Sequence, residues 1–338
     1  MNSIGIVVIG RNEGNRLKTC LLSLIKEENT IVYVDSGSTD GSVELAHSLD
    51  IFVVELDLSV PFTAARARNT GFTYLLQQKP DIEFVQFVDG DSQIVEGWLT
   101  KAAVEMLVQP DVVVIFGYLS ELFPKASIYN RICNIEWYVP AGETKYCGGI
   151  AMMRVTALKQ VGGFNPALIA GEEPELCLRL RQAGGKILAI DAEMARHDAA
   201  MTSFSQWWKR SVRNGYAYAE GAWSHNHWVK ESRRIWFWGL FLPLLTITSF
   251  FPTKGLSILL FVIANTYLFY RVYSITRLKG FEQKDSIIYG LFCTIDKYPM
   301  LYGQIKFHTS RLFKRSQPIM EYKNVLTEAK SEELGVRG

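Results

Sequence analysis

Cysteine is scarce in this chain of 338 residues, and the few cysteines have no metal-binding spacing. Five cysteines occur, an odd number, and no two of them stand in a CxxC or zinc-site arrangement. A framework of structural disulfides and a cysteine-based zinc site are therefore not expected. The sequence also has no basic leader followed by an apolar core, so we expect no signal peptide. These features predict reduced, inert thiols on the cytosolic side of a cell.

Basic charge is scarce in the front of the chain. Residues 1–200 hold 17 Lys and Arg against 25 Asp and Glu, whereas residues 201–338 hold 19 against 9. The acidic front part argues against nucleic acid as a partner. The basic rear part is interleaved with apolar runs, which suggests a surface that faces anionic lipid.

Charge is missing from two runs in the rear part, residues 235–251 and 255–270, which only Pro-Thr-Lys separates. Each run is at or just below the length that spans a bilayer. We therefore predict a membrane-associated helical hairpin over about 235–270; the alternative is a pair of buried helices in a soluble domain. The positive-inside rule would place both ends of the hairpin in the cytoplasm, since both are flanked by basic residues: Lys230, Arg233, Arg234, Arg271, Arg277 and Lys279.

A third apolar stretch, about 287–307, contains charged residues and is predicted to form an interfacial helix. We assign residues 221–320 to the membrane-associated helical region and residues 321–338 to a polar tail. The front part, residues 1–220, is predicted to be one catalytic domain.

The front part alternates strand and helix patterns. Apolar runs typical of buried strands occupy residues 4–10, 30–35, 51–56, 84–88, 112–118, 147–154 and 186–190. Repeated β-α-β units with nearly continuous Val and Ile predict an α/β fold with a mostly parallel sheet sandwiched by helices.

Polar residues follow three of these strands. Residues 10–13, Asp35 and the pair Asp89 and Asp91 all come where a strand ends, and ligands of such sheets bind at the carboxyl ends of the strands. Period-2 alternation places the two aspartates on one side of the backbone. Two carboxylates suit Mg or Mn, and such an ion can stabilise a departing diphosphate. The alternative is an ordinary polar turn.

Five motifs in order then give a family resemblance. They are IVVIGRNEGNRL at 6–17, VDSGSTDGS at 34–42, ARARNTG at 65–71, VDGD at 88–91 and GEEPELCLR at 171–179. Over residues 4–215 the chain resembles the family 2 glycosyltransferases, which are inverting enzymes with a nucleotide-sugar-binding fold of the GT-A type.

The resemblance implies a set of donor-binding residues. Glu13 would lie near the ribose, Asp35 would accept from the nucleobase, and Arg68 and Asn69 would hold the pyrophosphate side. Asp89 would lie on the nucleotide side, although Ser36 stands where the family often has a second Asp. Arg210 could pair with the diphosphate or lie on a solvated helix face.

The resemblance also implies metal ligands and a base. Asp91 would bind the metal, with Asp89 and His197 as further ligands; a structural histidine is the alternative. Glu173 takes the place of the catalytic base, where the family usually has Asp, and Glu172 lies beside it. We expect Glu172 and Glu175 to raise the pKa of Glu173 by like-charge repulsion. The alternative for these acids is favourable charge at a helix N-terminus, and Asp40 is expected to be a helix N-cap.

These features predict a metal-dependent, inverting hexosyltransferase at the inner (plasma) membrane, with its catalytic domain in the cytoplasm. It would move a sugar from a nucleoside diphosphate, UDP above all, to a hydroxyl of a lipid-linked saccharide in exopolysaccharide or cell-surface glycan synthesis. A nucleotidyltransferase is one alternative, although the segment at 10–14 is poor in the glycine that its phosphate loop needs. A membrane glycan-binding protein without catalysis is the other, and Glu173 in place of Asp is its only sign.

Overall fold

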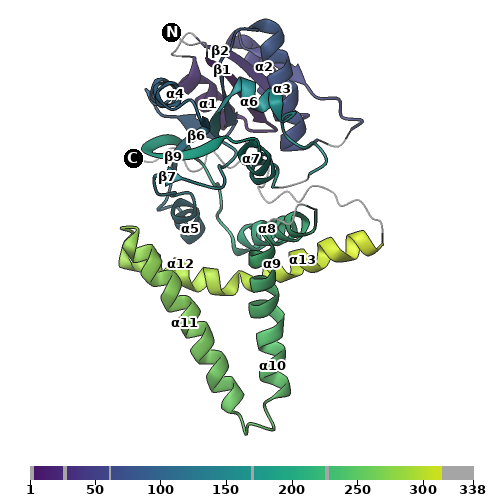
Figure 1. Cartoon of the computed structure of the whole chain (residues 1–338), viewed down its shortest axis with the longest axis vertical. Coiled ribbons are helices and arrows are strands. Elements are labelled where there is room, and N and C mark those ends of the chain that lie inside the picture. Colours follow the sequence, from purple (N-terminus) through teal and green to yellow (C-terminus); the bar gives the residue numbers. More distant parts are fainter. Residues whose placement is uncertain (1–3, 26–28, 61, 169–170, 225–227, 314–338) are drawn as a thin grey trace.

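The computed structural model describes residues 4–25, 29–60, 62–168, 171–224 and 228–313. The polar tail predicted over 321–338 lies outside these residues. Within them an α/β domain stands above a layer of helices, from which a helical hairpin projects (Figure 1).

The described strands form one mixed sheet in the order β3-β2-β1-β4-β8-β6-β9-β5, with β7 paired to β9. Strands β1 to β4 run parallel where they pair, as do β6 and β9, whereas β8 runs antiparallel between β4 and β6. The strands are β1 (Ile4–Gly10), β2 (Thr30–Asp35), β3 (Phe52–Glu55), β4 (Phe84–Asp89), β5 (Ser92–Ile94), β6 (Val112–Glu121), β7 (Gly142–Glu143), β8 (Ala151–Arg154) and β9 (Lys186–His197).

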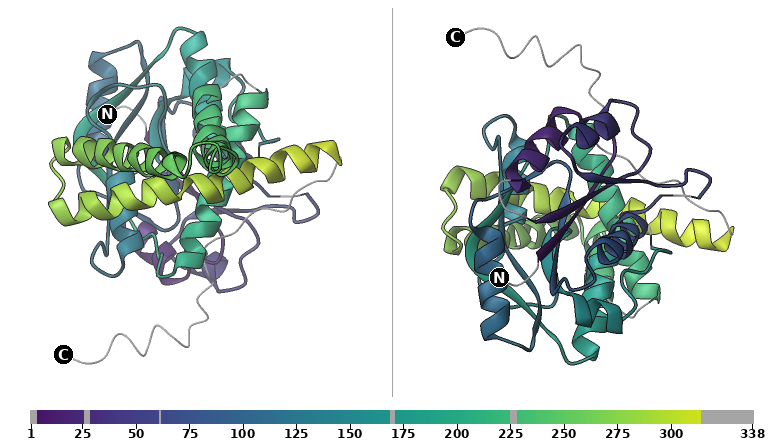
Figure 2. Two further views of the ribbon diagram at one scale, coloured as in Figure 1. Left: turned by 90° about the horizontal axis from the view of Figure 1, so that it is seen from below. Right: turned by 90° about the horizontal axis from the view of Figure 1, so that it is seen from above.

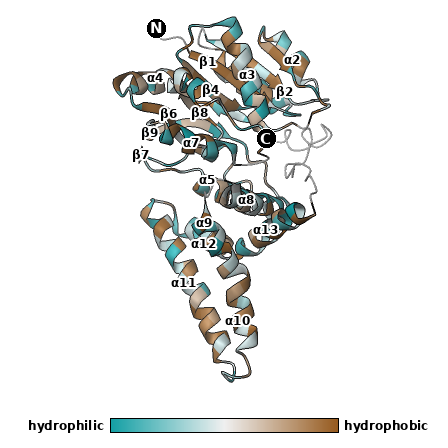
Figure 3. Ribbon diagram, turned by 45° about the vertical axis from the view of Figure 1, so that its right-hand side comes forward, coloured by the Kyte–Doolittle hydropathy of each residue, from teal (hydrophilic) through white to brown (hydrophobic). Residues whose placement is uncertain are grey.

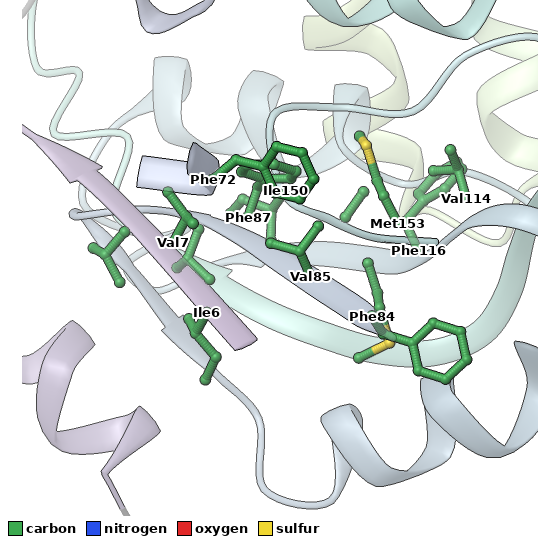
Figure 4. Packing of buried hydrophobic residues seen from close by; sticks show 14 of the residues in the cluster. Ile6, Val7, Phe72, Phe84, Val85, Phe87, Val114, Phe116, Ile150 and Met153 are labelled. Atoms are coloured by element: carbon green, nitrogen blue, oxygen red, sulfur yellow. The ribbon is translucent and has the colours of Figure 1, made fainter. Parts of the chain in front are cut away.

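Helices cover the sheet, as its apolar strands require. They are α1 (Asn15–Leu24), α2 (Ser42–Ser48), α3 (Ala64–Gln78), α4 (Trp98–Val108), α5 (Ile128–Glu136), α6 (Val155–Gln160) and α7 (Glu172–Gln182). Gly71 lets α3 approach the sheet closely, because a Cβ there would lie 2.4 Å from Val7 Cγ1. Phe72 of α3 shares one buried cluster with Phe87 and Ile150 (Figure 4). The predicted α/β fold is confirmed.

Two predicted strands have different bounds. The strand expected at 147–154 is only β8, because Cys147 to Ile150 form a loop beside the site described below. The strand expected at 186–190 continues to His197, since β9 shifts register along β6 and then pairs with β5. This extension carries His197 to the site.

The rear helices are α8 (Phe204–Ser224), α9 (Val229–Trp236), a π-helical segment η1 (Phe237–Phe241), α10 (Leu242–Thr248), α11 (Leu256–Leu278), α12 (Gln283–Ile295) and α13 (Lys297–Leu312). The boundary predicted at residue 220 falls inside α8. The single helix predicted over 287–307 is wrong: two helices meet at Asp296. Pro299 explains the break, because its missing N–H is tolerated in the first turn of a new helix but not inside a continuous one.

Helix α13 returns to pack on α8, and both lie across the lower side of the α/β domain (Figure 2). Two glycines allow this contact. A Cβ on Gly215 would lie 2.0 Å from the Met300 carbonyl oxygen, and one on Gly303 would lie 2.1 Å from that of Val212. The last described helix is therefore an integral part of the layer that carries the hairpin.

Candidate functional site

The carboxyl ends of β1, β2 and β4 lie at one edge of the sheet, as the sequence predicts. Gly10 is opposite Asp35, and Ile9 is opposite Asp89. The turns that follow β1 and β2 are tied together by side chains. Asn12 Oδ1 accepts a hydrogen bond from Thr39 N at 2.7 Å, and Asp40 Oδ2 accepts one from Gly14 N at 2.8 Å.

Asp40 is not the N-cap residue of α2, since Gly41 holds that position with φ 81°. Its carboxylate nevertheless lies at the start of the helix, where Oδ1 accepts from Ser42 N at 3.1 Å. The prediction was one residue off, because glycine takes the left-handed conformation more readily than aspartate.

Asp35 is buried and holds its own loop. Its Oδ1 accepts from the Tyr33 hydroxyl at 2.7 Å, and its Oδ2 accepts from Gly37 N and Ser38 N at 2.8 and 2.7 Å. Glu13 forms an ion pair with Arg16 at 2.8 Å. The donor-binding roles of Glu13 and Asp35 stay predictions. The observed hydrogen bonds of Asp35 stabilise the loop that follows β2.

Arg68 is the centre of the site. Its side chain is 3 % exposed and contacts three carboxylates. Nη1 lies 2.8 Å from Glu172 Oε1 and 3.4 Å from Glu173 Oε1, and Nη2 lies 3.0 Å from Asp89 Oδ1. The guanidinium that the resemblance places on the pyrophosphate thus binds protein carboxylates and fixes the position of α7 against β4.

Asn69 has a similar positioning task. Its amide nitrogen donates to the Phe164 carbonyl at 2.7 Å, and its Oδ1 accepts from Phe164 N at 2.9 Å. Both contacts hold the loop after α6, and the Phe164 ring lies edge-on to Phe87 at 5.2 Å.

Glu172 and Glu173 begin α7, after Gly171 at φ 82°. The pKa of Glu173 is raised to about 7, first by burial and then by the charge of Glu172, while Arg68 acts in the opposite direction. Glu175 was also predicted to raise the pKa of Glu173, but it does not contribute, because its carboxylate is paired with Arg179 at 2.7 Å. A carboxylate with such a pKa is suited to accept a proton near neutral pH.

The loop before β8 lies directly against this cluster. A Cβ on Gly149 would lie 2.6 Å from Arg68 Nη2, 3.0 Å from Asp89 Oδ2 and 3.1 Å from Glu173 Oε1. Gly149 is a site residue that the sequence reading missed, and the pair of glycines after Cys147 was the signal that could have found it.

Replacing this glycine gives a matched test. We expect Gly149→Ala to lower turnover by up to about 10²-fold, since sub-ångström displacement of a reacting group has effects of that size. Gly148→Ala should leave turnover unchanged, because no atom lies within 4 Å of the added methyl group. Steady-state kinetics of the two variants check this, and equal activity would contradict the assigned contact.

Asp91 and His197 come together from distant parts of the chain. Asp91 Oδ1 lies 2.8 Å from His197 Nε2, and both side chains are largely buried. Burial lowers the pKa of His197, which favours the neutral imidazole, the form that binds metals. The Trp137 ring packs on it with a centroid distance of 4.5 Å.

These two groups fit a divalent cation whose remaining ligands would come from a diphosphate, because Mg²⁺ sites often contain few protein ligands and Mn²⁺ accepts imidazole. Asp89 is turned to Arg68 instead. Among the described residues no group of three or more His, Cys, Asp or Glu side chains is arranged to hold a metal, so the three-residue ligand set stays a prediction.

Two further residues position this part of the site. Buried Glu121 accepts hydrogen bonds from Asn130 Nδ2 and from Ala199 N, both at 2.9 Å, and so fixes the chain just after His197. Arg210, predicted to bind the donor, forms an ion pair with Glu136 at 2.6 Å and connects α8 to α5.

All five cysteines lie in the described part of the chain and are free. Cys147 Sγ and Cys177 Sγ are 3.4 Å apart beside the cluster. Their contact and burial raise the pKa of Cys147 well above its usual value, which agrees with the prediction of inert thiols.

Comparison with known proteins agrees with this geometry. Residues 5–162 match the model of glycosyl transferase family 2, and residues 131–202 match one described as the N-terminal domain of galactosyltransferase. The pre-mycofactocin glycosyltransferase of Mycobacterium tuberculosis is 25% identical over 228 residues, which are 63% of this chain and 46% of that protein. The chain thus spans about half the length of the curated relatives it matches.

A solved structure of similar fold is the mannosyltransferase PcManGT from Pyrobaculum calidifontis, in complex with GDP-Man and Mn²⁺. Its sequence is 14% identical, the match covers 90% of this chain and 86% of that one, and the TM-score is 0.54. This likeness concerns the fold, which is of the GT-A type. Together with the ordered motifs and the convergence of their side chains on one edge of the sheet, the family match shows that residues 5–162 of the chain are similar to the glycosyl transferase family 2 domain.

Proposed function

We propose that the chain is an inverting hexosyltransferase that uses a nucleoside diphosphate sugar, UDP-sugar first, and an acceptor hydroxyl. The observation that carries this proposal is Glu173, a carboxylate with a pKa raised to about 7 that lies in one cluster with Asp89 of the carboxyl edge. The family match and the fold shared with a protein solved with GDP-Man and Mn²⁺ support a nucleotide-sugar donor.

In the proposed reaction Glu173 removes the proton from the acceptor hydroxyl as its oxygen attacks the anomeric carbon. The bond from that carbon to the diphosphate breaks, and the diphosphate leaves with the electron pair, so the configuration inverts. Arg68 and Asn69 hold the base and its loop in place. Asp91 and His197 would hold Mg or Mn, which supplies positive charge to the leaving diphosphate.

Hydrolysis of nucleotide sugars in the absence of acceptor tests this proposal. We expect slow release of UDP with Mn²⁺ present and loss of that release on chelation or in Asp91→Asn, because a neutral amide is a poor ligand for a hard cation. Release of inorganic pyrophosphate from a nucleoside triphosphate and sugar phosphate would favour a nucleotidyltransferase. Binding without any turnover would favour a non-catalytic glycan-binding protein.

We further propose that the rear helices attach the enzyme to the inner (plasma) membrane with the catalytic domain in the cytoplasm. Among the described helices, α11 is long and apolar enough to cross a bilayer. Many residues of the hairpin helices α10 and α11 are hydrophobic (Figure 3), and among them Leu245 is 62 % and Leu259 53 % exposed. Basic residues at both ends of the hairpin nearest the α/β domain agree with a cytoplasmic position. A membrane-bound enzyme suits a lipid-linked saccharide acceptor in cell-surface glycan or exopolysaccharide synthesis.

The hairpin gives a direct test of membrane attachment. The full chain should remain in the membrane pellet after a carbonate wash, whereas the double variant Leu245→Lys, Leu259→Lys should be released. Each lysine costs up to about 2.5–3.5 kcal/mol of insertion free energy, the value for the centre of a membrane helix. Truncation after residue 230 is a poor test, because it removes α13 and uncovers α8. Wild-type protein that leaves the pellet would show a soluble hairpin.

A further inference from the structure

Three aromatic side chains gather beside the N-terminus of α7. Tyr146 lies in the loop before β8, Tyr218 on α8, and Trp228 directly before α9. The Trp228 ring centroid is 5.0 Å from that of Tyr218 and 6.1 Å from that of Tyr146, both in edge-to-face arrangement. All three side chains are partly exposed. We call this group the aromatic platform.

Two short segments of the chain place the platform close to the Glu173 carboxylate. A Cβ on Gly171 would lie 3.2 Å from Trp228 Cζ3, and Gly171 precedes Glu173 by two residues, a backbone span of at most about 7 Å. Tyr146 precedes Gly149 by three residues, and Gly149 abuts Glu173. The rings therefore lie where a molecule presenting a hydroxyl to Glu173 would extend.

The backbone at Trp228 is strained. Its φ of 58° and ψ of 21° are left-handed, a conformation that is rare for bulky residues and common for glycine and asparagine. Such strain, which costs about 1–3 kcal/mol, collects at functional sites. A tryptophan in this place indicates that its ring serves a purpose beyond the turn.

The charges around the platform are mixed. Burial and then the charge of Glu231 raise the pKa of the Tyr146 hydroxyl, and the charge of Arg181 lowers it. Burial, together with nearby carboxylates, raises the pKa of Tyr218 to about 12, so this hydroxyl stays neutral and can donate a hydrogen bond. Ring faces, neutral hydroxyls and charges of both signs suit a neutral ligand with an apolar face and a polar rim, whereas a cation would select a purely acidic aromatic cage.

We propose that Trp228, Tyr146 and Tyr218 form an acceptor subsite in which a pyranose ring stacks on the aromatic platform. The C–H face of the sugar would lie on the rings, and its hydroxyls would reach the phenols. This inference rests on the proposed function, and it makes the acceptor a saccharide rather than a bare lipid alcohol or a protein.

The test uses the full chain in detergent and the methyl β-glycosides of glucose, galactose and mannose as probes. Trp228→Asn removes the ring and relieves the backbone, because asparagine accepts the left-handed conformation. Trp223→Ala is the matched control: Trp223 lies on α8, is 61 % exposed and contacts Arg311 rather than the platform. Saturation-transfer NMR measures binding independently of turnover.

We expect at least one glycoside to receive saturation at its ring protons in wild type and Trp223→Ala, and none in Trp228→Asn. Trp228→Asn should raise the acceptor KM about tenfold, equivalent to 1.4 kcal/mol, with a smaller effect on the donor KM. An unchanged acceptor KM, no binding by any glycoside, or displacement of the glycoside by choline would overturn the subsite. Lack of donor hydrolysis in wild type would instead defeat the proposed function, since glycoside binding is measured separately.

Discussion

Glu173→Gln should reduce transfer by about 10²- to 10⁴-fold, the usual contribution of a general base, while the donor binds as in wild type. The amide retains the size of the side chain but cannot take a proton from the acceptor. The measurement is kcat for transfer beside calorimetric donor affinity. Glu44→Gln is the control, an exposed glutamate in the first turn of α2, and it should leave both quantities unchanged.

The pH profile sharpens this test. Because the pKa of Glu173 is raised to about 7, kcat/KM should fall as the pH drops through that value and the base becomes protonated. Glu172→Gln removes the neighbouring negative charge, so the limb should move to lower pH with a milder loss of rate. A limb that stays in place would show that Glu172 does not raise the pKa of the base, and a larger loss in Glu172→Gln than in Glu173→Gln would assign the base to Glu172.

Arg68→Met should lower the free energy of unfolding by about 3–5 kcal/mol, the cost of removing one partner from a buried ion pair. The substitution leaves Asp89, Glu172 and Glu173 together without the positive charge that separates them. Arg68→Lys should rescue only part of this, because one ammonium group cannot form the same forked contacts. Urea unfolding of the detergent-solubilised chain measures the change.

The control for Arg68 is Arg196→Ala. Arg196 pairs with Glu193 at 3.0 Å but its side chain is 52 % exposed, so the loss should stay below about 1 kcal/mol. Arg68→Met should also raise the pKa of Glu173 further, since Arg68 lowers it in wild type. Equal stability of Arg68→Met and wild type would show that the three carboxylates do not depend on the guanidinium.

The sequence by itself determined the α/β domain and the edge at which its polar segments meet. Buried strands that alternate with helices leave few topologies, and parallel strands bring their carboxyl ends to one side. It also determined the helical hairpin of the rear part, because the uncharged runs 235–251 and 255–270 are long and apolar enough to form paired helices. These features depend on residues close together along the chain.

Only the tertiary structure decided which side chains touch. Asp91 and His197 are 106 residues apart, and no local pattern reveals that β9 extends far enough to join them. The motif predicts a phosphate ligand at Arg68 but does not reveal the three carboxylates that surround it. The role of Gly149 likewise depends on the atoms that an added methyl group would contact. The packing of α13 on α8 also could not be predicted from the sequence. Each of these contacts joins elements distant in sequence, so its energy depends on the path of the whole chain.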